Sequence, residues 1–102
     1  MSGYVLSADA DCDLDEIWEY IAADHIEAAD RWIGKLFDAF ESLGQTPGMG
    51  HRREDLTRHP VLFWPVGAYL VIYRAGSGPI EIVAVTQGSR DIPAFLSRRV
   101  RH

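Results

Sequence analysis

The segment GMGHRREDLTRHP, from Gly48 to Pro60, places three arginines and two histidines between two apolar stretches. A metal-free ribonuclease can be built from such groups, because it needs a base for the 2′-hydroxyl, an acid for the leaving oxygen and cations for the crowded phosphate. His51 or His59 could act as base or acid, with the cations drawn from Arg52, Arg53 and Arg74. Two histidines in a loop are more often ordinary surface residues. Gripping a partner, or merely joining two halves of a fold, therefore stays open as the role of this segment.

Other kinds of chemistry find little support in the sequence. The histidines and Cys12 lack the spacings typical of metal ligands, and no GxxxxGK[ST] phosphate loop is present. Cys12 stands among acidic residues, which would not activate a thiol, so we expect a small buried side chain there. The acids of the first half should alternate around a helix as a solvated face rather than converge for acid–base catalysis. We expect no metal, no cofactor and no catalytic residue.

Length and composition indicate one soluble domain covering residues 1–102. Apolar residues make up 47% of the chain and charged residues 25%, which is ordinary for a globular protein. The sequence has no apolar run long enough for a membrane span, and its first residues are acidic, unlike a signal peptide. A single cysteine fits a reducing compartment. We therefore expect a cytoplasmic protein that does not bind membranes.

Two amphipathic helices are predicted in the first half, after a short strand over Tyr4–Leu6. Apolar residues recur at steps of three and four in two runs: Leu14, Ile17, Trp18 and Ile21, then Ala29, Trp32, Ile33, Leu36, Phe37, Phe40 and Leu43. The second helix should end at Gly44, because glycine commonly terminates helices and Pro47 follows shortly after. A short link predicts an antiparallel hairpin, with Trp18, Trp32 and Phe40 in the core.

The second half predicts a meander of three strands and a final helix. Val61–Val66, Tyr69–Tyr73 and Ile80–Thr86 are rich in β-branched and aromatic residues and are separated by Gly and Pro turns. A short helix is predicted over Ile92–Val100, with Asp91 as its cap. The expected class is α+β, with the first strand and the helical hairpin packed on one face of a small, mainly antiparallel sheet. An open face or edge of this sheet would suit a partner peptide.

Charge is divided unevenly along the chain. Residues 1–49 hold eleven acidic side chains against Arg31 and Lys35, for a net charge of −9. Residues 50–102 hold eight arginines against four acids, for a net charge of +4. Such asymmetry fits either two solvated faces that attract each other or a basic surface offered to an acidic partner.

Four segments stand in a distinctive order over nearly the whole chain: YVLSADADCDLDEIWEYIA (Tyr4–Ala22), AADRWIGKLFDAFESL (Ala28–Leu43), PGMGHRREDL (Pro47–Leu56), and FWPVGAYLVIYR with IEIVAVTQGSRDIPAFL (Phe63–Arg74, Ile80–Leu96). In this order and spacing the sequence resembles the ParE toxins of type II toxin–antitoxin modules, within the RelE/ParE superfamily. The resemblance implies the fold predicted above. It also implies a toxin that a cognate ParD-like antitoxin neutralises and that, when free, inhibits DNA gyrase by binding rather than by catalysis.

The resemblance also suggests which residues meet the partners. We expect contacts with the antitoxin or the target from Arg52, Arg53, Arg58, Trp64 and Arg74. The C-terminal portion of ParE relatives is implicated in target inhibition, which points here to Arg90, Arg98, Arg99 and Arg101. No direct nucleic-acid binding is expected for the toxin alone. One departure is Gln87, since relatives often carry His-Gly before the (S/A)-R-D segment; if that histidine matters, this copy is weakly active.

Two alternatives remain. RelE-like relatives cleave messenger RNA with several basic residues on the sheet and near the end of the second helix, commonly with a terminal Tyr or His. This chain has one lysine, Lys35, and its strands carry little charge beyond Arg74 and Glu81. An acidic chain is also poorly suited to an all-phosphate site. These features favour a ParE toxin over a RelE-like mRNA endoribonuclease. The second alternative is a non-toxic remnant that only binds an antitoxin.

Overall fold

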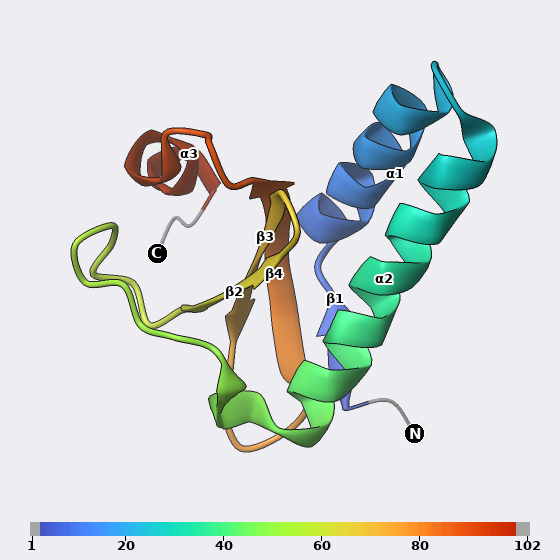
Figure 1. The fold of residues 1–102 in the computed structure, drawn as a ribbon. Coiled ribbons are helices and arrows are strands. Elements are labelled where there is room, and N and C mark those ends of the chain that lie inside the picture. Colours follow the sequence, from blue (N-terminus) through green and yellow to red (C-terminus); the bar gives the residue numbers. More distant parts are fainter. Residues whose placement is uncertain (1–2, 100–102) are drawn as a thin grey trace.

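The computed structural model describes residues 3–99, which form a four-stranded sheet with helices on both faces (Figure 1). In chain order the elements are β1 (Tyr4–Leu6), α1 (Ala8–Ala22), α2 (Ile26–Gln45), the 3-10 helix η1 (Pro47–Met49), β2 (Leu62–Val66), β3 (Tyr69–Arg74), β4 (Ile80–Gln87) and α3 (Ile92–Arg99). The strand order is β1-β4-β3-β2, with β2, β3 and β4 antiparallel and β1 parallel to β4. The predicted α+β class, helical hairpin and meander are confirmed. Among residues 3–99, no helix has the length and apolar character that a membrane span requires.

The hairpin helices begin at side-chain caps. Ser7 Oγ accepts a hydrogen bond from the Ala10 N–H at 3.0 Å, and His25 Nδ1 accepts one from the Ala28 N–H at 3.0 Å. The prediction that the second helix ends at Gly44 is wrong, because α2 runs on to Gln45. Gly44 lies instead against Gly3, where a Cβ would come within 2.8 Å of the opposite backbone. This glycine permits a close approach of the second helix to the N-terminal strand.

The sheet has a core on each face. The hairpin covers the first core, built from Ala10, Leu14, Ile17, Leu36, Phe40, Leu43, Tyr69, Val71, Tyr73, Ile80, Ile82 and Val85. The second core lies under α3 and the loop before β2, and consists of Val61, Phe63, Ile72, Ala84, Ile92, Phe95 and Leu96. The face opposite the hairpin is therefore partly covered rather than fully open. Phe40 is buried as predicted. Trp32 is half-buried and packs against the first core, and Trp18 is half-buried as well.

Two neighbouring residues of α1 contradict the sequence predictions. Cys12 is exposed, although we expected it to be buried. Asp13 is buried at 5% exposure, although we expected the acids to form a solvated face. The reason is helix geometry: Asp13 falls on the same stripe as Ala10, Leu14 and Ile17, while Cys12 is turned about 100° away from Asp13.

Tyr73 fastens the chain after α2 to the sheet. Its side chain is fully buried, and its hydroxyl donates to the Pro47 carbonyl at 2.6 Å and accepts from the Gly50 N–H at 2.8 Å. Burial raises the pKa of the Tyr73 hydroxyl above its ordinary value. A Cβ at Gly50 would collide with that hydroxyl, so glycine is required for this approach. The start of the following loop is thus held against β3.

We predict that Tyr73→Phe lowers the free energy of unfolding by about 1–2 kcal/mol, because the Pro47 carbonyl and the Gly50 N–H lose their partner. Urea denaturation measures the difference. Tyr20→Phe is the matched control, since Tyr20 is 70% exposed and its substitution should leave the midpoint unchanged. Equal midpoints for wild type and Tyr73→Phe would contradict the prediction.

Candidate partner-binding surfaces

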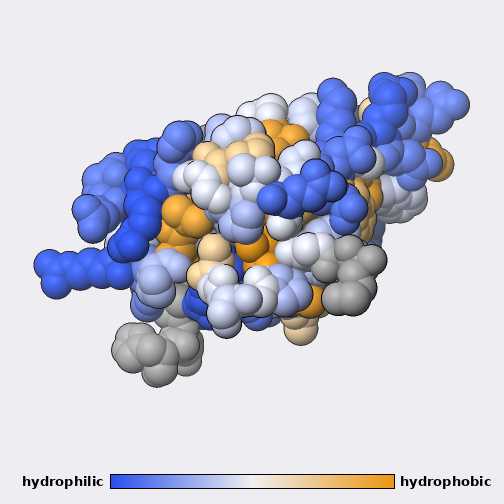
Figure 2. All heavy atoms as spheres, turned by 90° about the horizontal axis from the view of Figure 1, so that it is seen from below, coloured by the Kyte–Doolittle hydropathy of each residue, from blue (hydrophilic) through white to orange (hydrophobic). Residues whose placement is uncertain are grey.

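Charge separates onto the two sides of the sheet. All eleven acids of the first half fall between residues 8 and 45, within the hairpin layer. The opposite side carries the basic loop, defined here as residues 50–61, together with α3 (Figure 1). On the face seen from below, hydrophilic residues extend on both sides and apolar surface is confined to patches between them (Figure 2). An acidic layer and a basic layer are thus held apart by a largely uncharged sheet.

The arginines of the basic loop are exposed. Arg53 makes a two-pronged ion pair with Asp55, from Nε to Oδ1 at 3.0 Å and from Nη2 to Oδ2 at 2.8 Å. These hydrogen bonds lower the pKa of the Asp55 carboxyl and raise that of the Arg53 guanidinium. Arg52 lies 3.9 Å from Glu54, and Arg58 is exposed. Exposed pairs of this kind contribute little to stability, so these arginines remain available to a partner.

His51 attaches the basic loop to the edge of the sheet. Its N–H and carbonyl exchange hydrogen bonds with Phe63 of β2, at 2.9 and 2.8 Å. The imidazole stacks on Trp64, with ring centroids 6.4 Å apart and planes 26° apart. Trp64 is half-buried and packs against the first core, on the hairpin face. The loop therefore has a defined position along β2, and Trp64 supports that position.

A groove lies beside the second core, on the side of the sheet that carries the basic loop and α3. We call it the basic-rimmed groove; its volume is about 540 Å³. Apolar side chains line much of it: Leu56, Phe63, Pro65, Leu70, Ile92 and Pro93. Polar residues complete the lining: His51, Arg53, Arg90 and Asp91, with Gly88 between them. Arg53 and Arg90, which the sequence could not place together, share this groove.

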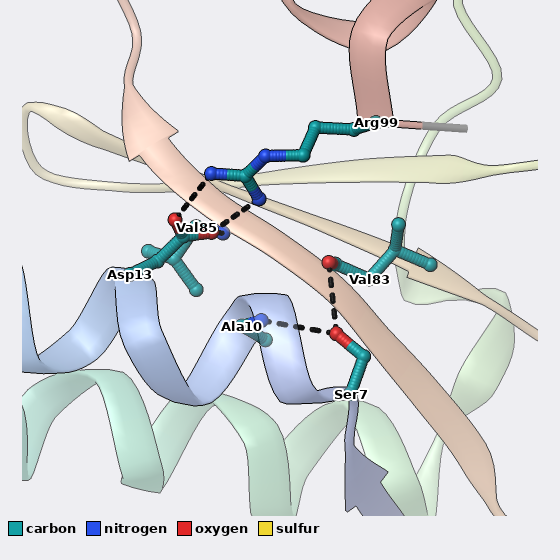
Figure 3. A network of polar contacts seen from close by, with 6 residues as sticks. All are labelled: Ser7, Ala10, Asp13, Val83, Val85 and Arg99. Atoms are coloured by element: carbon teal, nitrogen blue, oxygen red, sulfur yellow. Dashed lines mark hydrogen bonds and ion pairs between the residues drawn. The ribbon is translucent and has the colours of Figure 1, made fainter. Parts of the chain in front are cut away.

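Asp13 and Arg99 join the first helix to the last. Arg99 donates from Nη2 to Asp13 Oδ1 at 2.7 Å and from Nη1 to Oδ2 at 3.1 Å, and the Val85 N–H donates to the same Oδ2 at 3.0 Å (Figure 3). We call this set of contacts the Asp13–Arg99 latch. The hydrogen bonds to Asp13 raise the pKa of Arg99 above its ordinary value. The pairing offsets the free-energy cost of burying the Asp13 charge, and removing either partner would leave the other charge uncompensated.

The latch lies at the part of β4 that follows the end of its pairing with β1. A register shift in the β3–β4 ladder pairs Tyr73 with Ile82 and Ile72 with Ala84, so that Val83 has no opposite residue. Beyond this bulge the Val83 carbonyl accepts a hydrogen bond from Ser7 Oγ at 3.0 Å, and the Val85 N–H donates to Asp13 (Figure 3). Side chains at the start of α1 therefore satisfy the β4 backbone past the point where β1 ends.

The residues predicted for target inhibition have different surroundings. Arg90 and Arg99 lie over the Phe95 ring, at 5.1 and 4.6 Å from its centroid. Arg98 is exposed at the end of α3, and Arg101 lies outside the described residues. Arg90 also borders a polar cleft of about 280 Å³ between α1 and α3, which Gln87 and the latch residues line as well. Arg90 and Arg98 are thus the exposed cations of this region within residues 3–99.

Arg74 stands apart from the other predicted contact residues. It ends β3, at the opposite end of the strand from Leu70, which lines the basic-rimmed groove. There it pairs with Glu81 of β4 at 3.3 Å. Of the groups that could cleave RNA, His51 and Arg53 line the groove and Arg74 does not. No group of three His, Cys, Asp or Glu side chains in the described part of the chain could hold a metal ion.

Sequence reasoning missed Asp13 and the apolar lining of the groove. A signal for Asp13 was present, because an acid on the apolar stripe of an amphipathic helix must be buried and therefore needs a partner. The groove gave no such signal. Its lining comes from the basic loop, β2, β3, the β4–α3 connection and the first turn of α3, and only the tertiary fold brings these together.

Three comparisons with known proteins agree with this architecture. The model of the ParE toxin of the type II toxin–antitoxin system parDE matches residues 4–92. Toxin ParE1 of Caulobacter vibrioides is 34% identical over 97 residues, which cover 94% of this chain and 99% of that relative. A solved structure of a chromosomal ParDE TA system from P. aeruginosa superposes with a TM-score of 0.71 at 19% identity, covering 85% of this chain and 96% of that chain. The chain belongs to the ParE toxin family of type II toxin–antitoxin systems.

Proposed function

We propose that a ParD-like antitoxin binds and neutralises this toxin through the basic-rimmed groove, and that the free toxin inhibits DNA gyrase by stoichiometric binding. The observation that carries the proposal is the groove itself. It joins an apolar floor to Arg53 and Arg90, on the side of the sheet away from the acidic hairpin. An amphipathic segment with acidic residues would match both features.

Arg53 is the best candidate for an antitoxin anchor. Its guanidinium is already oriented by Asp55, which reduces the cost of ordering the side chain on binding. Exposed in the free toxin, this pair contributes little. Covered by a partner, an arginine with two charge-assisted hydrogen bonds becomes costly to remove. Arg52 and Arg58 are proposed to contribute to the same interface from the basic loop. Trp64 lies on the hairpin face and is proposed to contribute through its stacking on His51, which lines the groove.

We predict that Arg53→Ala weakens antitoxin binding by about 2 kcal/mol or more, which corresponds to about a thirtyfold rise in Kd. Isothermal titration with the purified antitoxin measures the effect. Arg31→Ala is the matched control, because Arg31 is an exposed arginine on the acidic hairpin. If Arg52→Ala and Arg53→Ala both bind antitoxin and gyrase normally, the loop is only a connector.

We assign target inhibition to Arg90, Arg98 and the chain that follows, with Arg101 and Arg99 included as the sequence suggested. Exposed arginines before and at the end of a short helix suit contacts with an acidic protein surface. Binding rather than catalysis is inferred because Arg74 pairs with Glu81 and does not line the groove that holds His51 and Arg53. The proposed target places this activity in the cytoplasm.

The gyrase proposal predicts that the purified toxin blocks DNA supercoiling at about one toxin per enzyme, and that adding antitoxin restores it. A gel-based supercoiling assay with titrated toxin measures both. RNA incubated with the same toxin, with and without ribosomes, should stay intact. Normal supercoiling at stoichiometric excess would refute the gyrase target. Cleaved messenger RNA would favour the RelE-like alternative, and unaffected growth on expression without antitoxin would favour the non-toxic remnant.

A further inference from the structure

The Asp13–Arg99 latch joins residues 86 positions apart in the sequence. The Asp13 side chain is only 6% exposed, and each of its oxygens accepts at least one hydrogen bond (Figure 3). The Arg99 side chain remains 26% exposed and lies over Phe95. Asp13 therefore cannot reach a partner protein, whereas the helix that carries Arg99 can.

The helix held by the latch is short. α3 has eight residues, and isolated helices of that length are not stable in water. Ile92, Phe95 and Leu96 anchor its apolar side to the second core. The latch acts at its last described turn, where Asp9 and Glu16 add further negative potential around Arg99. The position of the C-terminal turn thus depends on a carboxylate supplied by α1.

We propose that Asp13 is a positioning residue for target inhibition: through Arg99 it holds α3, with the exposed Arg98 at its end, in the orientation that the target binds. This inference rests on the proposed role of α3 in inhibition. The latch lines the polar cleft between α1 and α3 and acts at the last turn of α3, whereas the basic-rimmed groove meets α3 only at Ile92 and Pro93 of its first turn and is lined by neither Asp13 nor Arg99. Inhibition and antitoxin binding should therefore respond differently when the latch is broken.

The decisive variant is Asp13→Asn, which removes the charge but keeps the size and one acceptor oxygen for the Val85 N–H. If α3 is loosened, ordering it on binding the target costs free energy, so inhibitory potency should fall at least about tenfold. Amide exchange in α3 should become about tenfold faster. The Kd for antitoxin should stay within about threefold, which also reports that the variant is folded. Asp15→Asn, an exposed acid on the same helix, should change none of these values.

Two further variants separate positioning from direct contact. Arg99→Lys keeps the charge but not the two-pronged pairing, and should restore part of the potency that Arg99→Gln loses. If Asp13 acts only through Arg99, Asp13→Asn should cause no further loss in the Arg99→Gln background. Arg98→Gln should reduce inhibition without changing amide exchange in α3.

Inhibition is measured both as gyrase supercoiling and as growth arrest at matched toxin levels. A folded Asp13→Asn toxin with full potency would overturn the proposal, as would equal losses of inhibition and antitoxin affinity. Faster exchange in α3 without any loss of potency would also overturn it. Growth arrest by the wild type with normal gyrase activity would refute the gyrase target alone, and the same variants would then be judged by growth arrest.

Discussion

The need to satisfy the backbone of β4 organises this fold. β1 pairs only with Ile80–Ile82, and the bulge at Val83 then turns further backbone groups toward the open edge. Buried N–H and C=O groups without partners cost free energy comparable to lost hydrogen bonds. Ser7 and Asp13 supply the missing partners from the start of α1. The docking of the hairpin therefore follows from hydrogen bonding at one sheet edge as well as from apolar packing.

The Asp13 carboxylate accepts hydrogen bonds from two sources, the β4 backbone and the Arg99 guanidinium. Its charge lies in the acidic layer and its cation comes from the basic layer, so the latch spans the division of charge along the chain. Arg53 and Arg74 pair within the second half of the chain instead. The latch is one place where the two halves of the chain attract each other, and the arginines of the basic loop remain exposed.

Local patterns were sufficient to predict the helices, the meander and the family, because each depends on periodicity or on the order of segments. Interactions between distant segments were not predictable in the same way. Nothing near Tyr4–Leu6 indicates a parallel partner in Ile80–Ile82, and Gly44 gave a stop signal where the fold uses it for close contact with Gly3. Propensity describes what a residue allows locally, and tertiary contacts decide between the options.

The candidate site was only partly predictable for the same reason, because it depends on contacts between distant segments. Arg53 and Arg90 were identified by residue type alone, but their shared groove depends on Leu56, Phe63 and Leu70, whose apolar character gives no hint of a binding surface. Cys12 and Asp13 differ by one step along α1 and exchange their expected environments. An error of one residue in helical phase is enough to hide a buried charge.

The strand order β1-β4-β3-β2 has a consequence for synthesis on the ribosome. The ribosome makes β1 and α1 before β4, so β1 cannot pair with β4 until β4 has been synthesised. Asp13 likewise cannot pair with Arg99 until Arg99 has been added. Contacts between such distant residues form late because their loops are long. A nascent chain released before residue 99 is made would leave the α1 carboxylate without its cation. The finished fold therefore requires β4 and α3 as well as the hairpin, and a product that stops before them would lack the contacts that hold β1 and Asp13.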